Sequence, residues 1–183
     1  KRTIEFALFM GEEQGLLGSK YMVKKYKEDG KLNKVKLMIN LDMVNNAQGF
    51  NTGGSPELKA FVETINTKIK TIDTSYQSRL SNRAGLHSDH QPFMLEGIPT
   101  CSPSGNFSIK ALNCYHANCD RFDLINKQQI NNNVRYTAML LYALANADDL
   151  TLPVMNDTTL KKFLIDQNLK EPLILGKEWR WEE

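Results

Sequence analysis

The sequence has 183 residues, of which 41% are hydrophobic and 24% charged, and a net charge of +2 at neutral pH. This length suits one domain with a substantial core, and so balanced a charge argues against nucleic acid as a partner. No apolar run reaches the roughly 20 residues needed to cross a bilayer, so we expect no membrane span.

The first part of the chain predicts a strand, a helix and a second strand. Residues 3–10 carry apolar side chains on both faces, which is typical of a strand inside a sheet. Residues 16–29 predict a helix that ends at Gly30, and residues 35–44 predict another strand. We expect the two strands to be parallel, with a right-handed crossover, because a helix connects them.

The middle of the chain alternates turns with short elements. Residues 45–57 are rich in turn formers, and within them Ser55 and Pro56 suit the N-cap and first position of a helix. Residues 88–97 predict a short helix that ends at a glycine, and residues 98–102 predict a short buried strand.

The last part of the chain predicts two helices. Asn126 and Gln129 resemble a capping box, followed by apolar residues at helical spacing. A further helix is predicted around residues 157–168, and the tail from Asp148 onward shows no pattern associated with chemistry.

Acidic residues lie near the ends of both predicted strands of the first unit. Glu12 and Glu13 follow the first strand, and Asp42 lies near the end of the second. Ligands bind beyond the carboxyl ends of parallel strands, so we expect three carboxylates at one rim. Without a cation they would raise one another's pKa values, and an oxygen-rich site with one or two histidines suits zinc or manganese.

The three histidines are His87, His90 and His116. They form no HExxH pattern, which excludes a helical zinc site of that type. His116 lies in a loop and is the expected nitrogen ligand of the acidic rim, whereas His87 and His90 are expected to have structural or supporting roles. Between those two, Asp89 could cap a helix, orient a catalytic group, or do both.

The three cysteines leave the redox compartment open. Cys114 and Cys119 are close enough in sequence for a short disulfide loop, but small buried thiols explain them equally well. Cys101 makes the count odd, and no CxxC pair indicates a metal site.

Four segments, in this order, resemble a known enzyme family: GEEQGLLGSKY, INLDMV, GLHSDHQPFMLEGIPT and YHANCD. The family is that of the co-catalytic di-zinc exopeptidases, which includes leucyl aminopeptidases, plasma glutamate carboxypeptidase and the more divergent glutaminyl cyclases. The resemblance implies an α/β fold, a three-layer α/β/α sandwich with a mostly parallel central sheet. It also implies that residues 1–147 are the C-terminal portion of a catalytic domain truncated at its N-terminus, with residues 148–183 as an extension packed on it.

The resemblance implies a role for each acidic residue of the rim. Glu12 is similar to the family's general base, which takes a proton from a metal-activated water and passes it to the leaving amine. Glu13 is similar to a ligand of one zinc ion, Asp42 to a ligand of the other, and His116 to the histidine ligand from the late loop. The complete enzyme is thus expected to hold two zinc ions.

Other positions match the family or depart from it. Asp89 and Tyr115 are expected near the base, the ligands and the substrate. Ala117 and Arg121 stand where the family usually has threonines, and the eleven residues before Glu12 contain neither the family's first histidine ligand nor its bridging aspartate. We therefore expect the chain to be inactive alone and to need a missing N-terminal portion of the same protein as its partner.

The expected function is metal-dependent exopeptidase activity on peptide substrates, with aminopeptidase ahead of carboxypeptidase or dipeptidase. One alternative is an acyltransferase like the glutaminyl cyclases, and another is a catalytically inactive, peptidase-like binding domain. A third is a metal-free α/β domain with a chance acidic rim. Because members of the family are commonly exported, we expect a periplasmic or extracellular location.

Overall fold

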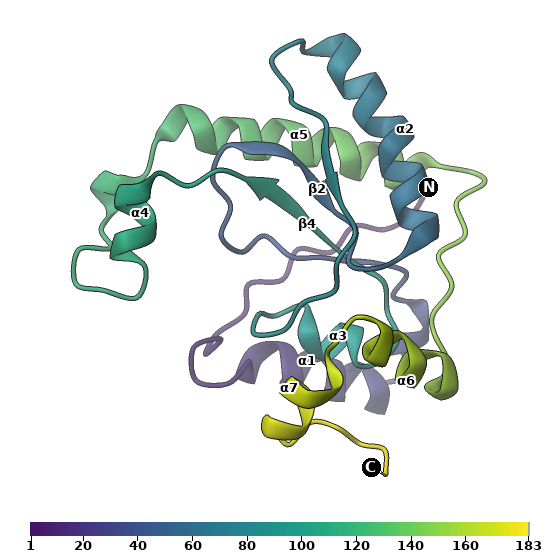
Figure 1. Cartoon of the computed structure of the whole chain (residues 1–183). Coiled ribbons are helices and arrows are strands. Elements are labelled where there is room, and N and C mark those ends of the chain that lie inside the picture. The colour runs from purple at the N-terminus through teal and green to yellow at the C-terminus, as the bar shows by residue number, and fades with distance from the viewer. Residues whose placement is uncertain (183) are drawn as a thin grey trace.

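A computed structural model describes residues 1–182, and a mixed four-stranded sheet lies at its centre (Figure 1). The strands are β1 (Met38–Ile39), β2 (Ala47–Asn51), β3 (Arg79–Ser81) and β4 (Thr100–Gly105), in the spatial order β1-β4-β2-β3. The β1–β4 and β2–β3 pairs are parallel, whereas β2 and β4 are antiparallel. The expected α/β class with a mostly parallel sheet is therefore confirmed.

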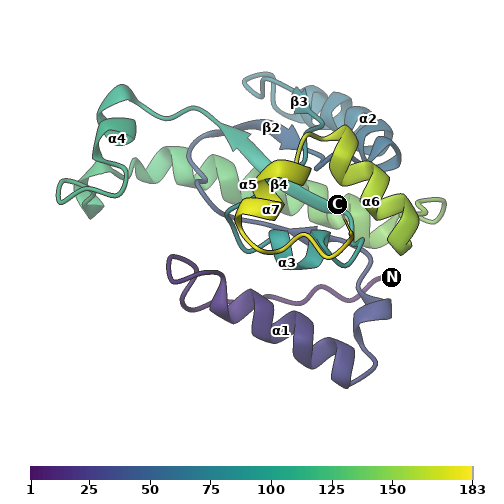
Figure 2. The same cartoon turned by 60° about the horizontal axis from the view of Figure 1, so that its bottom comes forward.

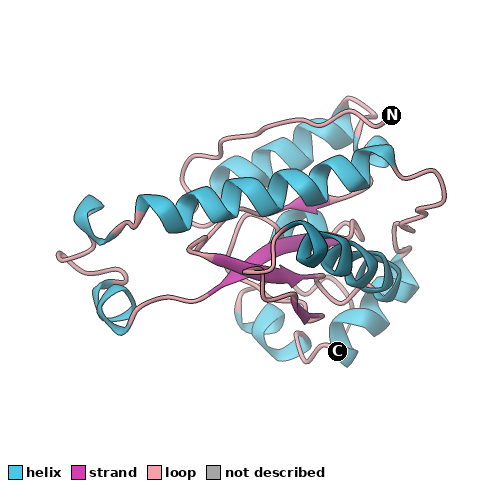
Figure 3. Cartoon of the chain, turned by 90° about the horizontal axis from the view of Figure 1, so that it is seen from above, coloured by secondary structure: helices cyan, strands magenta, loops and turns pink. Residues whose placement is uncertain are grey.

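Two long helices, α2 (Pro56–Ile72) and α5 (Lys127–Asn146), cover one face of this sheet (Figure 3). Both begin as predicted, because the Ser55 side chain accepts a hydrogen bond from the Leu58 amide and the Asn126 side chain caps α5. Their apolar stripes meet the sheet in the largest buried cluster of the molecule. Its principal members are Phe50, Leu58, Val62, Tyr76, Tyr136 and Leu140.

The opposite side of the sheet carries α1 (Leu17–Glu28) and α3 (Gln91–Met94), as Figure 2 shows. Val23 and Phe93, one from each helix, belong to a second buried cluster together with Ile98. These two helices form the third layer of the sandwich. Both lie within the residue ranges that the sequence predicts.

The C-terminal segment packs next to α3. It contains α6 (Asp157–Asp166), which confirms the helix predicted there, and α7 (Lys170–Leu175), which the sequence did not indicate. Leucines of both helices form a third buried cluster with Met94 of α3. One more helix, α4 (Ile109–Cys114), projects to one side in Figure 1.

The prediction of a strand over residues 3–10 is wrong. This segment has no strand assignment, and Phe6 and Leu8 are 81% and 98% exposed, while Phe9 packs beside Phe93. A strand forms only when a neighbour accepts its backbone hydrogen bonds, and no described strand pairs with this segment. The expected parallel pair with a crossover helix is consequently absent from residues 1–182, and β1 pairs with β4 instead.

The other strands also differ in extent from the predictions. Of residues 35–44 only two belong to β1. The turn-rich segment 45–57 contains β2, which the sequence did not indicate. The predicted strand over residues 98–102 is confirmed as β4, which begins two residues later. Among residues 1–182, no helix has both the length and the apolar character to cross a membrane.

Candidate metal centre and the cleft beside it

The segment GEEQG forms a tight turn immediately before α1. The amides of Gly15 and Leu16 both donate to the Glu12 carbonyl oxygen at 2.9 Å, and the Gly18 amide donates to Met10 at 2.9 Å. A Cβ atom on Gly18 would lie only 2.8 Å from the backbone of Met10, so this close approach requires glycine. The turn fixes the backbone from which Glu12 and Glu13 project.

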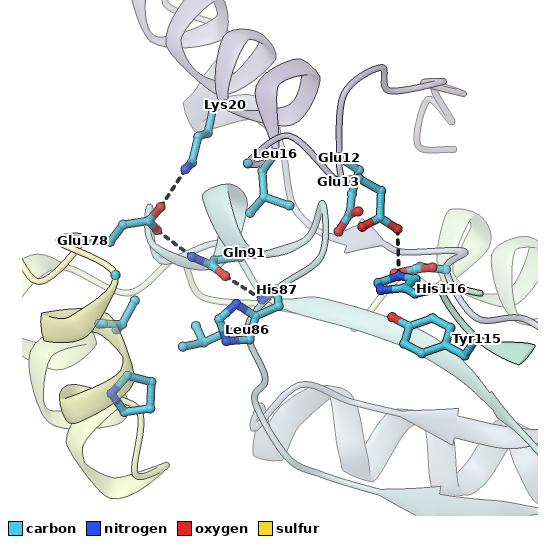
Figure 4. Close-up of a pocket in the computed structure, with 15 residues that line it drawn as sticks. Glu12, Glu13, Leu16, Lys20, Leu86, His87, Gln91, Tyr115, His116 and Glu178 are labelled. Carbon is cyan, nitrogen blue, oxygen red and sulfur yellow. Dashed lines mark hydrogen bonds and ion pairs between the residues drawn. The ribbon is translucent and has the colours of Figure 1, made fainter. Parts of the chain in front are cut away.

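Glu13 and His116 contact each other directly, as Figure 4 shows. Glu13 Oε1 and His116 Nε2 are 2.9 Å apart. His116 lies in a short loop closed by a disulfide between Cys114 and Cys119, which decides between the two interpretations of these cysteines. The Tyr115 ring stacks on the imidazole with the ring centres 3.9 Å apart, so it restricts the orientation of the imidazole.

Asp42 lines the same cleft from the segment that follows β1. Its Oδ2 atom accepts a hydrogen bond of 2.6 Å from the Ser88 hydroxyl, which itself accepts one of 2.7 Å from the Asn40 amide. These contacts attach Asp42 to the segment that contains Asp89. Ser88 and Asn40 are both buried, so the carboxylate is held on a rigid support.

The acidic side chains influence one another's protonation. Burial raises the pKa of Glu12 above its ordinary value, and the charges of Glu13, Asp42 and Asp89 raise it further, while His116 opposes them. Asp89 Oδ1 is buried and has no hydrogen-bond partner among the described residues. The four carboxylates thus form one acidic region, although they do not reach it on paired strands as expected.

The two histidines near Asp89 differ from each other. His90 is largely buried, and its Nε2 donates to the Gly85 carbonyl oxygen at 3.1 Å. Burial lowers the pKa of His90, which favours the neutral ring and a structural role. His87 is exposed on the cleft.

The carboxylates and the imidazole of this region are ligand types that zinc accepts, but their arrangement matches a zinc site only in part. Zinc–nitrogen and zinc–oxygen bonds of about 2.0–2.2 Å place neighbouring tetrahedral ligands roughly 3.3 Å apart, which is close to the 2.9 Å between Glu13 and His116. Within residues 1–182, however, no three His, Cys, Asp or Glu side chains converge as a metal site would require. The pair fits two positions of a zinc site, and Asp42 does not join it.

A cleft of about 360 Å³ extends from this acidic region toward α7. Figure 4 shows Glu12, Glu13 and His116 on one side and Lys20 and Glu178 on the other. Apolar side chains line the cleft as well. They are Leu16, Leu86, Pro172 and Leu173.

The sequence predicts one site made of Glu12, Glu13, Asp42, Asp89, Tyr115 and His116. All of them line the cleft except Asp89, which lies behind it. Their individual roles stay predictions. The reasoning missed the opposite wall, whose residues come from α1, α3 and the C-terminal segment. No local motif marks these residues, because only the tertiary fold brings them together.

Comparisons with known proteins agree with this description. A family model described as Peptidase family M28 matches residues 1–141. A probable leucine aminopeptidase 2 from Aspergillus fumigatus is 28% identical over 202 aligned positions, which cover 93% of this chain and 38% of that protein. The chain therefore spans little more than a third of the length of this relative.

Solved structures share the fold. A peptidase M28 precursor from Shewanella amazonensis matches 82% of this chain and 33% of its own, with a TM-score of 0.65 and 20% identity. A zinc aminopeptidase from Bacillus subtilis matches 76% of this chain and 35% of its own, with a TM-score of 0.59 and 24% identity. A glutaminyl cyclase from an Acidobacteriales bacterium matches 71% of this chain and 46% of its own, with a TM-score of 0.51 and 18% identity.

Proposed function

We propose that the complete protein is a metal-dependent aminopeptidase. The proposal starts from the fact that this chain belongs to peptidase family M28. The similarity to a probable leucine aminopeptidase over almost the whole chain favours an aminopeptidase within this family. The proposal concerns the complete protein, because the chain spans only part of the length of its relatives. Its expected substrates are peptides with a free amino terminus.

The observation that carries the proposal is the contact between Glu13 and His116 beside Glu12. A carboxylate and an imidazole 2.9 Å apart are suited to binding zinc, and the adjacent Glu12 faces the same cleft. When bound, zinc supplies Lewis-acid activation of water and of the peptide carbonyl group. We assign Glu13 and His116 to binding one zinc ion of the complete protein, and Asp42 to binding the other.

Glu12 is assigned the proton transfer. Its carboxylate takes a proton from the attacking water and delivers it to the nitrogen of the leaving amine. The backbone turn before α1 holds Glu12 in place, and the neighbouring Glu13 is occupied by His116. Asp89 and Tyr115 support this arrangement, since Asp89 adds negative charge near Glu12 and Tyr115 stacks on His116.

The proposal includes a site completed by residues outside this sequence. Because no three donors converge within residues 1–182, we expect the chain by itself to bind zinc weakly and to hydrolyse no peptide. The complete protein is proposed to hold two zinc ions, with further ligands from an N-terminal portion. Equilibrium dialysis that finds two tightly bound zinc ions on the isolated chain, together with peptide turnover, would contradict this.

The disulfide supports a second part of the proposal, an exported location. Disulfides persist in oxidising compartments such as the periplasm and the extracellular space, and Cys114–Cys119 closes the loop that holds His116. Fractionation of cells that express the complete protein, followed by immunodetection, tests this. Detection only in the reducing cytosol would contradict it.

The decisive experiment compares two reactions of the zinc-loaded complete protein. Aminopeptidase activity releases free amino acids from leucyl peptides, whereas a glutaminyl cyclase converts an amino-terminal glutamine to a ring without cleaving a peptide bond. We expect the first product and not the second, with loss of turnover in Glu12→Gln. Cyclisation alone would replace the proposal, and binding without any turnover would favour an inactive peptidase-like domain.

A further inference from the structure

His87 lines the candidate active-site cleft, but the proposed zinc chemistry does not use it. The residue lies in the segment between β3 and α3, and its side chain is exposed on the cleft. Figure 4 shows its imidazole between the acidic residues on one side and the pair of Lys20 and Glu178 on the other. Within residues 1–182 only the backbone amide of His87 has a hydrogen-bond partner, so both imidazole nitrogens can face a bound molecule.

The backbone of His87 has an unusual conformation. Its φ of +66° lies in the left-handed region, which residues other than glycine seldom occupy. Such a conformation persists only where its surroundings hold it, and residues of this kind are concentrated at active sites and ligand-binding sites. The contacts that hold His87 therefore bear on its role.

Gln91 holds the backbone of His87 from one side (Figure 4). Its Oε1 atom accepts a hydrogen bond of 2.7 Å from the His87 amide, and its Nε2 atom donates one of 2.5 Å to the Glu178 carboxylate. Glu178 also accepts a hydrogen bond of 2.6 Å from Lys20 Nζ of α1. Gln91 is only 5% exposed, so this network is anchored in the interior. Residues of α1, α3 and the C-terminal segment thus fix the position of His87.

Ser88 fixes the same backbone from the other side. It is buried, and its hydroxyl donates a hydrogen bond of 2.6 Å to Asp42 Oδ2. Because Asp42 is a proposed zinc ligand, these contacts hold His87 in a defined position relative to the proposed site of the reaction. A molecule that contacts His87 would therefore be oriented relative to that site.

The charges along the cleft give a bound peptide a direction. Glu12 lies among other carboxylates, and the free amino terminus of a peptide is largely protonated at neutral pH, so we expect the amino terminus at this acidic end. At the opposite end the charge of Glu178 is paired with Lys20, and Gln91 and His87 add polar groups. The residue that follows the scissile bond is therefore expected beside His87.

We propose that His87 is a substrate-contacting residue, whose imidazole donates a hydrogen bond to the main-chain carbonyl oxygen of the first leaving residue. Gln91 and Glu178 are positioning residues, because they hold the His87 backbone. The ligand class is a peptide, whose leaving group carries such an acceptor, as opposed to an amino-acid anilide, whose leaving group has no carbonyl group. This inference rests on the proposed aminopeptidase function and adds recognition of the leaving side of the substrate.

The test compares two substrates with the same amino-terminal residue in the zinc-loaded complete protein. Leucyl-glycinamide has a main-chain carbonyl group in its leaving group, and leucyl p-nitroanilide has none. His87→Ala should lower the ratio of their kcat/KM values, glycinamide over anilide, about fivefold, which is the size expected for one hydrogen bond. The loss should appear mainly in KM of leucyl-glycinamide, because the bound substrate already makes this contact. An unchanged ratio in His87→Ala would overturn the proposal.

Three further variants separate the contact from an effect on folding. His87→Gly suits the left-handed backbone and should lower the ratio as much as His87→Ala does, so it keeps the test decisive if the alanine variant does not fold. His87→Gln keeps an N–H donor and should lower the ratio less. Arg83→Ala is the matched control, because Arg83 is exposed in the same segment but does not line the cleft. An equal fall in Arg83→Ala, or an unchanged ratio in His87→Gly, would overturn the proposal.

The positioning role of Glu178 has its own test. Glu178→Ala releases the Gln91 side chain and should lower the ratio by less than His87→Ala does, again through KM of leucyl-glycinamide. Glu178→Gln can still accept the hydrogen bond from Gln91 and should restore part of the ratio. An equal slowing of both substrates in Glu178→Ala, which is what a general disturbance of the fold would cause, would overturn the positioning role.

A binding measurement separates this inference from the proposed function. Calorimetric titration of the zinc-loaded Glu12→Gln protein, in which we expect binding without turnover, compares leucyl-glycinamide with leucinamide. The inference predicts tighter binding of leucyl-glycinamide, by a margin that an added His87→Ala change reduces about fivefold. Hydrolysis of both kinetic substrates with an unchanged ratio in His87→Ala would overturn the inference alone. Absence of hydrolysis by the wild type, with a binding preference that depends on His87, would overturn the proposed function and leave the contact in place.

Discussion

Glu13 and His116 contact each other on one side of the cleft, with Oε1 and Nε2 2.9 Å apart, although they lie in distant parts of the sequence. One is held by the turn before α1, and the other by the disulfide loop after α4. Two independent local constraints therefore converge on one contact.

The first prediction concerns zinc affinity. His116→Ala and Glu13→Gln each remove a donor and should weaken zinc binding by more than about tenfold, because even partners outside the ligand set cost that much in other zinc sites. Competition with a chromophoric chelator measures this on the chain. His87→Ala is the control, since His87 is exposed on the same cleft but is not a proposed ligand. Equal weakening by His87→Ala would contradict the assignment.

The second prediction concerns the disulfide. Reduction, or the double change Cys114→Ser and Cys119→Ser, frees the loop that holds His116 and should weaken zinc binding while the core stays folded. Burial raises the pKa of Cys101 to about 12, so this third thiol should resist alkylation until the chain unfolds. Mass spectrometry after mild reduction should therefore find label on Cys114 and Cys119 only. Early labelling of Cys101 would contradict its burial.

The third prediction concerns the general base. Glu12→Gln keeps the shape of the side chain but removes its ability to accept a proton, so kcat should fall by about 10² to 10⁴ with zinc content unchanged. Steady-state kinetics on a leucyl substrate, with metal analysis of the same sample, measures both quantities. Glu57→Gln, an exposed glutamate at the start of α2, is the matched control. Full activity in Glu12→Gln would assign the proton transfer to another residue.

The fourth prediction concerns acid stability, away from the cleft. Hydrogen bonds from Ser75 and Tyr136, and the nearby Arg135 charge, lower the pKa of Asp73 to about 2. The depressed pKa means that Asp73 stabilises the folded state above pH of about 4, and that this contribution is lost as the pH falls toward 2. Urea unfolding should therefore show Asp73→Asn less stable than the wild type at pH 7.

At pH 2 the difference between Asp73→Asn and the wild type should largely disappear, because the wild-type carboxyl group is then substantially protonated. Asp149→Asn, at an exposed acid, serves as the control and should change stability little at either pH. A difference between Asp73→Asn and the wild type that stays constant from pH 7 to pH 2 would rule out this linkage.

The longer helices could be predicted well from the sequence because their signals are local, whereas the short helices α4 and α7 were not predicted. Ser55 before Pro56, and Asn126 before α5, are capping residues that act within a few positions of themselves. The strands were predicted less well, because a strand depends on its neighbours. β2 contains Gly49, where a Cβ would lie 1.8 Å from the Arg79 carbonyl oxygen, and only this close pairing explains a strand in so polar a segment.

The candidate site likewise has one part that could be predicted from local sequence patterns and one part that could not. Glu12, Glu13 and His116 lie in segments that each have a recognisable local pattern, so the sequence predicted that they meet. The opposite wall depends on Lys20 and Glu178, and neither residue has a local pattern that indicates the other. Their ion pair exists because leucines of α6 and α7 pack beside Met94, which is a property of the tertiary fold.

The backbone at His116 has a consequence for engineering the protein. Its φ of +55° lies in the left-handed region, which costs most L-residues roughly 1 kcal/mol and which glycine adopts without strain. A redesign guided only by thermostability would thus favour glycine at this position and would discard the imidazole that meets Glu13. Backbone strain and the proposed metal-binding role are therefore in competition at this one residue, and position 116 should be held fixed in any such optimisation.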